Sequence, residues 1–199
     1  MAFDTPENRE ILIRSHPALE TDPYFYVSSD KTLEYNCIAW AMGFNDRWVD
    51  HLPDYDKAVK KWWPAGVPRG FHPDCLIQAF QAVGFELCHD DKYEEGYEKI
   101  VIYYLQPFII PRYGIYESIG WTHAAKVLTE KTYHSKMGDK FDIYHSSGNL
   151  FVGSSYGAIY AYMRRPLVNR RIIEVIIAQE QKYVIPANID DIVASKLNS

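Results

Sequence analysis

The chain has 199 residues, of which 47% are hydrophobic and 24% charged, as is typical of a folded globular domain and not of a disordered segment. Its net charge of -5 at pH 7 argues against a nucleic-acid binder, because such proteins usually carry a basic face. The longest apolar stretches are far shorter than the roughly 20 residues that cross a bilayer, and the N-terminus does not resemble a secretory signal. We therefore expect a cytoplasmic protein that binds neither a membrane nor nucleic acid.

The first half of the chain favours helices. Residues 1–33 are rich in Pro, Asp, Ser and Glu, which predicts an irregular arm with one short helix near Glu7–Arg14. Pro73 suits a first helical position and Gly84 a position just past a helix end. Three helices are expected after the arm: one that begins at Asn36 or Cys37 and stops at Gly43, then Asp54–Trp62, then His72–Val83.

The second half is rich in β-branched and aromatic residues, which favour strands. The expected strands are Lys99–Gln106, Trp121–Thr129, Lys131–Gly138 after a turn, Phe141–Ser147, Tyr156–Arg165 and Arg170–Ala178. Phe141–Ser147 also suits a tight connection, and Arg170–Ala178 also suits a helix. A terminal helix is expected at Asp190–Leu197. Helices followed by a mainly antiparallel sheet indicate an α+β fold, with an arm at 1–33, a core at 34–166 and an extension at 167–199.

Cys37 is the residue around which we expect any chemistry to be arranged. A cysteine at a helix start lies next to unpaired N–H groups and a partial positive charge, which stabilise a thiolate. Such a nucleophile needs a base, usually a histidine, and a third group that orients the base. His123 is the best candidate base, because it lies on a predicted strand and is followed by the small residues Ala124 and Ala125.

The third group is expected on the next strand or its loop. Asp142 and His145 are the two candidates, with Asn149 as a weaker one. The pattern alone leaves Asp142 and His145 equally open.

Two other interpretations of the cysteines remain open. A lone cysteine in an apolar segment commonly packs in a core without reacting. A zinc site is a second possibility, because a histidine and a cysteine three residues apart suit one helical turn. The four residues it would use are His72, Cys75, Cys88 and His89.

The order of a helix-borne cysteine, a further helix and a strand with the letters THAA resembles the papain-like cysteine peptidase superfamily, distantly its NlpC/P60 members. The chain also resembles an uncharacterised bacterial family with four motifs. These are NCIAWA at Asn36–Ala41, WWP at Trp62–Pro64, THAA at Thr122–Ala125 and SK-x-G at Ser135–Gly138.

The resemblance implies a papain-like α+β core with Cys37 as nucleophile, His123 as general base, and Asp142 or His145 as the group that orients the imidazole. It also implies a substrate cleft, to which we assign Asn36, Trp40, Trp63 and Trp121. No metal or cofactor is expected. The implied activity is a thiol hydrolase or acyltransferase acting on a peptide or glutamine amide through a thioester. The alternative is a non-catalytic module that binds a protein partner.

Overall fold

The computed structural model describes residues 3–52, 61–106, 108–110, 115–117, 120–153 and 156–167. Most of its strands form one seven-stranded sheet in the order β1-β10-β9-β8-β5-β11-β4, and every neighbouring pair in it is antiparallel. The strands are β1 (Tyr26–Val27), β4 (Glu86–Cys88), β5 (Tyr97–Tyr104), β8 (Trp121–Val127), β9 (Tyr133–Lys136), β10 (Asp142–His145) and β11 (Ala158–Pro166). The predicted α+β class with a mainly antiparallel sheet is confirmed.

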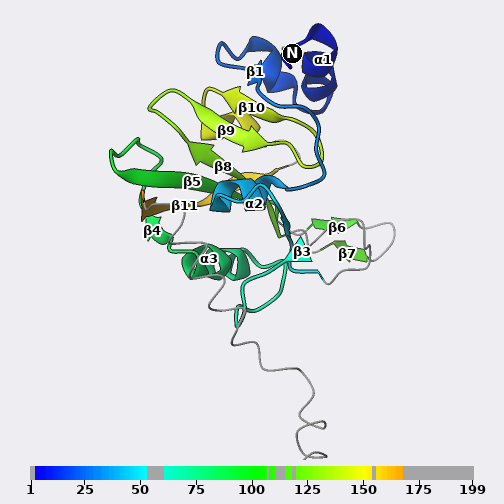
Figure 1. The fold of residues 1–199 in the computed structure, drawn as a ribbon. Helices are drawn as coiled ribbons and strands as arrows, with labels where there is room; N and C mark the ends of the chain where they lie inside the picture. The colour runs from blue at the N-terminus through cyan, green and yellow to red at the C-terminus, as the bar shows by residue number, and fades with distance from the viewer. Residues whose placement is uncertain are drawn as a thin grey trace, which may run out of the picture. The chain divides into compact units, whose positions relative to one another are not determined.

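One face of the sheet packs on the N-terminal part of the chain. Helix α1 (Pro6–Ser15) and the 3-10 helix η1 (Pro17–Thr21) contribute Leu12 and Leu19 to an apolar cluster that includes Tyr103 of β5 and Val127 of β8. The short 3-10 helix η2 (Gly148–Phe151) adds Phe151 to the same cluster. Figure 1 shows α1 beside β1 and β10.

The sequence predicts an irregular arm at 1–33, whereas residues 3–33 are largely built into this fold. Strand β1 pairs with β10, and Leu12, Leu19, Phe25 and Val27 are all buried. Apolar residues are too widely spaced in this segment to show the period of a helix or a strand. Its regular structure is therefore stabilised by burial against the sheet and not by local propensity.

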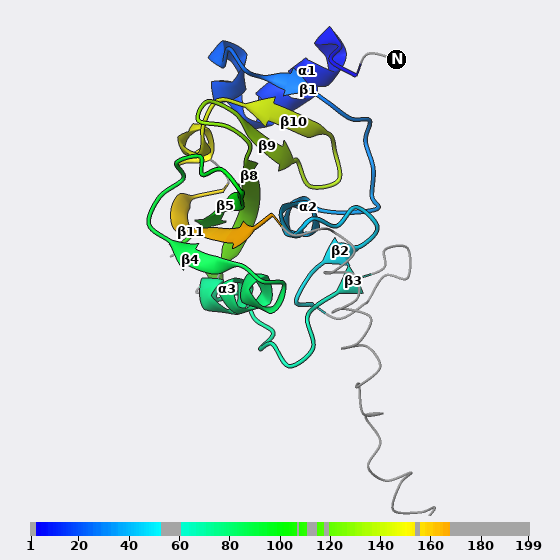
Figure 2. The ribbon, with the colours of Figure 1, turned by 60° about the vertical axis from the view of Figure 1, so that its left-hand side comes forward.

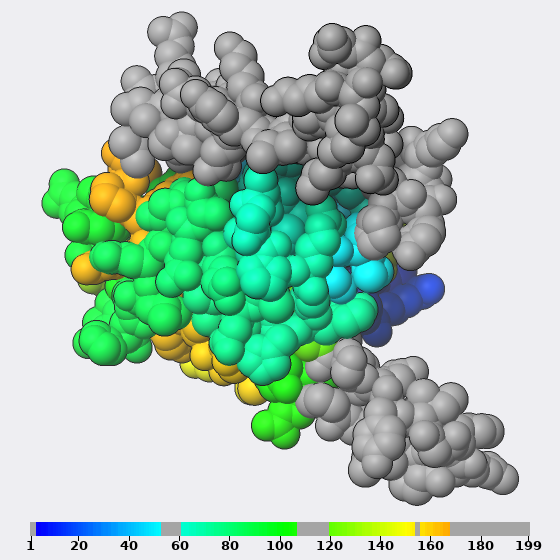
Figure 3. Space-filling model, turned by 90° about the horizontal axis from the view of Figure 1, so that it is seen from below, coloured from blue at the N-terminus to red at the C-terminus, as the bar shows by residue number. Residues whose placement is uncertain are grey.

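The other face of the sheet packs on helix α2 (Cys37–Met42), which contacts β8 and β9. Helix α3 (Pro73–Ala82) contributes Leu76 and Phe80 to the buried core. Figure 2 shows α3 beside β4, with α2 apart from it and close to β2. Seen from below, most of the coloured surface belongs to the chain between β3 and β4, which includes α3 (Figure 3).

Two small sheets lie outside the main one. Strand β2 (Trp48–Val49) pairs in parallel with β3 (Lys61–Trp62), and β6 (Phe108–Ile110) pairs with β7 (Ile115–Glu117). The helix predicted at Asp54–Trp62 is wrong for its last two residues, which form β3, and its other residues lie outside the described ranges. Pairing with β2 supplies the backbone hydrogen bonds that a helix would otherwise supply.

The remaining predicted elements agree with observed ones to within two or three residues at each end. The strand or helix at Arg170–Ala178, the helix at Asp190–Leu197 and nearly all of the extension at 167–199 lie outside the described residues. Among the helices that are described, none is long and apolar enough to cross a membrane.

Candidate functional site

Asn36 fixes the start of α2. Its side-chain oxygen accepts hydrogen bonds from the backbone N–H of Ala39 at 3.0 Å and of Val49 at 3.2 Å, so it is the N-cap of the helix. Its side-chain N–H donates to Val49 O at 2.8 Å. The predicted role of Asn36 in binding substrate stays untested, and in this state its carboxamide joins the first turn of α2 to β2.

The Cys37 thiol lies where the sheet opens between β8 and β9. These strands pair only at Lys126 with His134 and at Val127 with Tyr133. The Leu128 N–H donates to Thr132 O, so N–H groups at alternate positions along β8, including that of Ala124, point toward β9.

Beyond the last paired residues, the sulfur of Cys37 accepts the hydrogen bond of the Ala124 N–H that would otherwise go to β9. The N–H groups of Ile38 and of Cys37 itself, at the first turn of α2, also lie close enough to this sulfur to favour its thiolate form. The thiol therefore lies beside the peptide bond that joins His123 to Ala124.

The effect of burial on the pKa of Cys37 is larger than the effect of these N–H groups. Removal of the thiol from water raises the pKa of Cys37 to about 11, although the N–H groups of Ala124, Ile38 and Cys37 and the charge of Lys136 act in the opposite direction. The residue is 8% exposed. In this state the thiol is protonated at neutral pH.

His123, on β8, belongs to a chain of hydrogen bonds with two residues of the neighbouring strands. Its Nε2 lies 3.1 Å from Ser135 Oγ on β9, and the same oxygen lies 2.9 Å from His145 Nε2 on β10. His145 Nδ1 lies 3.1 Å from Ser147 O.

The direction of these bonds follows from the last acceptor. A carbonyl oxygen only accepts, so His145 Nδ1 carries the proton and its Nε2 is an acceptor. The Ser135 hydroxyl then donates to His145, and His123 Nε2–H donates to Ser135. This assignment leaves His123 Nδ1 with its lone pair, as a general base requires.

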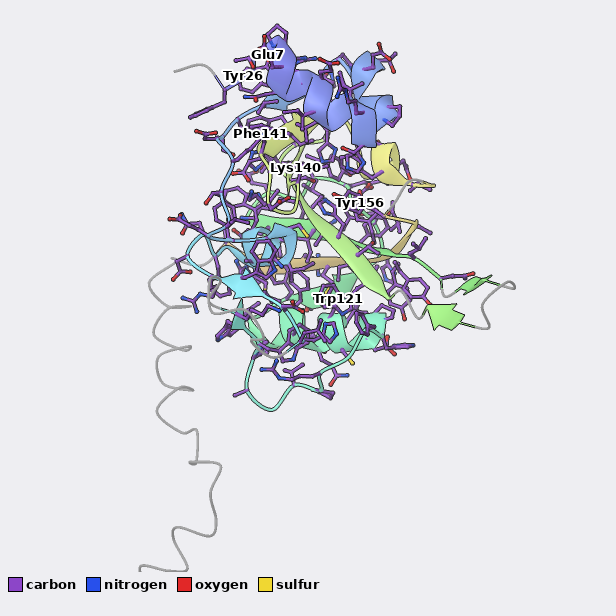
Figure 4. The ribbon with its side chains drawn as sticks, turned by 90° about the vertical axis from the view of Figure 1, so that its right-hand side faces the viewer. Glu7, Tyr26, Trp121, Lys140, Phe141 and Tyr156 are labelled. Atoms are coloured by element: carbon purple, nitrogen blue, oxygen red, sulfur yellow. The ribbon has the colours of Figure 1, made fainter. Side chains whose placement is uncertain are left out.

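Nδ1 of His123 has no hydrogen-bond partner among the described residues, the Cys37 thiol included. The His123 ring is fully buried and stacks on Tyr156 with centroids 4.2 Å apart and planes 8° apart. Figure 4 shows Tyr156 toward α1 and η2, with Trp121 lower, toward α3. Burial, then the charges of His145 and His16, hold the pKa of His123 well below 6.5, so the ring is neutral.

Asp142 and His145 lie on opposite faces of β10, because residues three apart on a strand point to opposite sides. His145 faces His123. Asp142 pairs in register with Lys136, and its carboxylate accepts a hydrogen bond from the Tyr35 hydroxyl at 2.7 Å. The structure thus brings His145, through Ser135, to the imidazole and holds Asp142 elsewhere.

The three tryptophans assigned to a cleft lie at two places. Trp40 packs beside β9, with its ring 5.1 Å from His134 and under the Lys126 ammonium. Trp63 and Trp121 stack on each other with centroids 6.2 Å apart. Asn149 lies in η2, where its carbonyl accepts the Val152 N–H.

Ser135 and Tyr156 were not predicted as site residues, although Ser135 opens the SK-x-G motif. A serine on a strand and a tyrosine after a turn carry no distinguishing local pattern. The residues of the alternative zinc site do not gather either, since the described part of the chain has no cluster of three or more His, Cys, Asp or Glu side chains fit to hold a metal.

A family model described as a domain of unknown function, DUF7689, matches residues 26–164. The chain matches no curated protein and no solved structure. The matched span runs from β1 almost to the end of β11, and it contains the thiol and every residue of the hydrogen-bond chain at His123.

Proposed function

This chain belongs to the DUF7689 family, whose domain is described as being of unknown function, and we propose that it is a thiol-dependent hydrolase or acyltransferase acting on an amide. The observation that carries the proposal is the position of the Cys37 sulfur at the Ala124 N–H, one peptide bond along β8 from His123, whose assigned tautomer leaves Nδ1 with its lone pair. A nucleophile and its base then come from α2 and β8, the arrangement of a papain-like core. We further propose the cytoplasm as its compartment, since its three cysteines are free thiols.

In the proposed reaction His123 Nδ1 accepts the thiol proton, and the Cys37 sulfur attacks the amide carbonyl carbon. The oxyanion that forms is held by N–H groups at the start of α2 and at Ala124. The C–N bond breaks, the amine leaves with the proton from His123, and a thioester remains on Cys37. Water or an acceptor amine then attacks the thioester and returns the thiol.

In this structure, where the thiol and the imidazole are both buried, transfer of the proton from Cys37 to His123 is unfavourable. The proton must pass from a thiol whose pKa is raised to about 11 to an imidazole whose pKa is well below its usual 6.5, so the transfer costs free energy. Burial is the largest cause of both shifts, so contact with water or with polar substrate groups reduces the cost. The proposed enzyme is therefore active in a more open state of the site.

The second candidate is a non-catalytic module that binds a protein partner. It is favoured by the same burial, which leaves a protonated thiol with no hydrogen bond to the His123 ring. In this case Cys37, His123, Ser135 and His145 serve to hold β8, β9 and β10 together.

Iodoacetamide labelling at pH 7 to 8, followed by peptide mass spectrometry, distinguishes the two. An enzyme whose site opens labels Cys37 faster than the half-buried Cys75 and Cys88, and His123→Phe slows that labelling. A sealed core labels Cys37 slowest and accelerates only as the pH approaches about 11. That second result would refute the enzymatic proposal.

A further inference from the structure

A cluster of four rings, which we call the His51 cluster, lies apart from the histidine chain of the thiol site. The His51 ring contacts Phe71 at 4.2 Å, Trp121 at 5.3 Å and Trp63 at 6.3 Å between centroids, each at an angle above 70°. Trp63 and Trp121 stack on each other. His51 was not singled out from the sequence, because two of its ring partners, Phe71 and Trp121, lie far along the chain.

Hydrogen bonds hold the cluster in one arrangement. Arg69 donates to His51 O at 3.1 Å, the Trp121 N–H donates to Phe71 O at 3.1 Å, and the Trp121 indole N–H donates to Gly70 O at 3.0 Å. The segment at residues 69–71 thus binds both His51 and the start of β8. The geometry of the rings is therefore fixed by the backbone around them.

The two segments that carry the cluster also hold the start of α2. His51 lies two residues after Val49, whose N–H and carbonyl bond to Asn36, the residue before Cys37. Trp121 lies three residues before Ala124, whose N–H contacts the thiol. A bulge in the pairing with β5 sets Trp121 opposite Tyr104, and this puts Trp121 on the face of the sheet that Ala124 and α2 share.

His51 has hydrogen-bonding capacity that the described residues do not use. It is 6% exposed, yet neither ring nitrogen forms a hydrogen bond within the described part of the chain. Asp50 Oδ1 lies 3.4 Å from Nδ1, so a carboxylate faces that nitrogen and favours the proton there. Nε2 then presents a lone pair among aromatic rings, at a cost that native proteins usually avoid.

We propose that His51 Nε2 accepts an N–H from an uncharged amide group of the substrate, which lies flat against the rings of Trp121 and Phe71. This inference rests on the proposed function and names the part of the amide substrate that the cluster recognises. Nε2 of His51 is itself shielded from solvent, whereas Phe71 is 46% exposed, so the amide approaches on the Phe71 side and reaches Nε2 once the Phe71 side chain turns aside.

The surrounding charges select an uncharged N–H donor. Lys61 lies 3.0 Å from Asp50 Oδ2 and Arg69 is bonded to the His51 carbonyl, so two cations disfavour an ammonium ligand. An anionic ligand would need a hydrogen-bond donor from His51. The Nδ1–H of His51 already faces Asp50, so the ring has no donor left for an anion. Burial, the largest cause, also lowers the pKa of His51, which keeps the ring neutral. A planar amide satisfies Nε2 and matches the flat ring faces.

The test uses nitrogen NMR of the full chain with labelled histidines, in a Cys37→Ala variant that has no nucleophile. The probe is propionamide, and its matched control is N,N-dimethylpropionamide, which keeps the carbonyl and lacks the N–H. We expect the Nε2 resonance of His51, assigned through His51→Phe, to move upfield saturably with propionamide alone. We also expect His51→Phe to weaken the binding that tryptophan fluorescence reports by about tenfold, with the exposed His89→Phe as its control.

No movement of the His51 resonance, or equal movement with both probes, would overturn the inference. Because the NMR variant lacks the thiol, the outcome does not depend on the reactivity of Cys37. A shift with propionamide alongside an unreactive Cys37 would keep the His51 site and refute the enzyme. A reactive Cys37 with no shift would do the reverse.

Discussion

Ser135 Oγ lies 3.1 Å from His123 Nε2, and this contact decides which nitrogen of the imidazole keeps its proton. Since Ser135 also bonds to His145, one hydroxyl on β9 satisfies buried histidines on both neighbouring strands. The contact gives the candidate base a fixed tautomer without a carboxylate.

Ser135→Ala is expected to lower the free energy of unfolding by about 1–3 kcal/mol, because it leaves two buried ring nitrogens without a partner. The tautomer of His123 is then no longer fixed, so labelling of Cys37 slows if the site is catalytic. Urea unfolding and iodoacetamide labelling measure the two effects. Ser135→Thr, which keeps the hydroxyl, is the matched control, and equal stability of Ser135→Ala and the natural protein would contradict the assigned hydrogen bonds.

The protein is expected to lose stability in acid. Burial is the largest cause that lowers the pKa of His134 and of His145 to about 4 and that of His123 well below 6.5. The unfolded chain binds these protons near pH 6.5 and the folded chain does not. Stability is therefore fully present above about pH 6.5 and falls toward pH 4, by about 1.4 kcal/mol per pH unit for each histidine.

Urea midpoints between pH 7.5 and 4.5 measure this loss. Asp142 acts in the opposite direction in the lowest part of the range, because burial, the largest cause, raises its pKa. His145→Gln is expected to make the pH dependence shallower, whereas the exposed His89→Gln leaves it unchanged. A midpoint that does not move with pH would contradict the burial of these rings.

The sequence predicted the elements best where apolar and polar residues alternate with the regular period of a strand or a helix. Long strands such as β5 and β8 and the helix α3 were predicted close to their observed bounds, and Cys37 was placed correctly at a helix start. The two-residue strands β1 and β2 carry no period, so tertiary pairing alone defines them.

The sequence was less informative about the candidate site, because its contacts join distant strands. Alternation along a strand already separates Asp142 from His145, since three residues put them on opposite faces. Which of the two faces His123 depends on the register of β10 on β9, and the sequence does not show that register. Ser135 and His51 have ordinary local surroundings, and only their partners across the fold give them a role.

Arg165→Met is expected to destabilise the fold by about 3–5 kcal/mol. The side chain of Arg165 is nearly fully buried, donates to Met42 O at the end of α2 and to Val83 O after α3, and pairs with Glu98 at 2.6 Å. Its loss leaves two carbonyls and a carboxylate without their donor. The matched control is the neighbouring Arg164→Met, whose partly exposed side chain pairs with Glu86 and Glu94, and for which thermal unfolding should show a smaller change; equal effects of the two variants would contradict this assignment.

Gly120→Ala tests the close approach that builds the His51 cluster. A Cβ at Gly120 would overlap the carbonyl of Phe71, the group that accepts the Trp121 N–H. We expect a loss of about 1–3 kcal/mol or more, together with a shift of tryptophan fluorescence as the cluster separates. The control is Gly84→Ala, where φ is +91° and nothing lies within 4 Å of the added Cβ, so that only the cost of the left-handed backbone remains, about 1 kcal/mol. A fluorescence shift as large in Gly84→Ala as in Gly120→Ala would mean that the indoles report general loosening of the fold, and the close contact of Gly120 with Phe71 would then have no special role in placing the rings around His51.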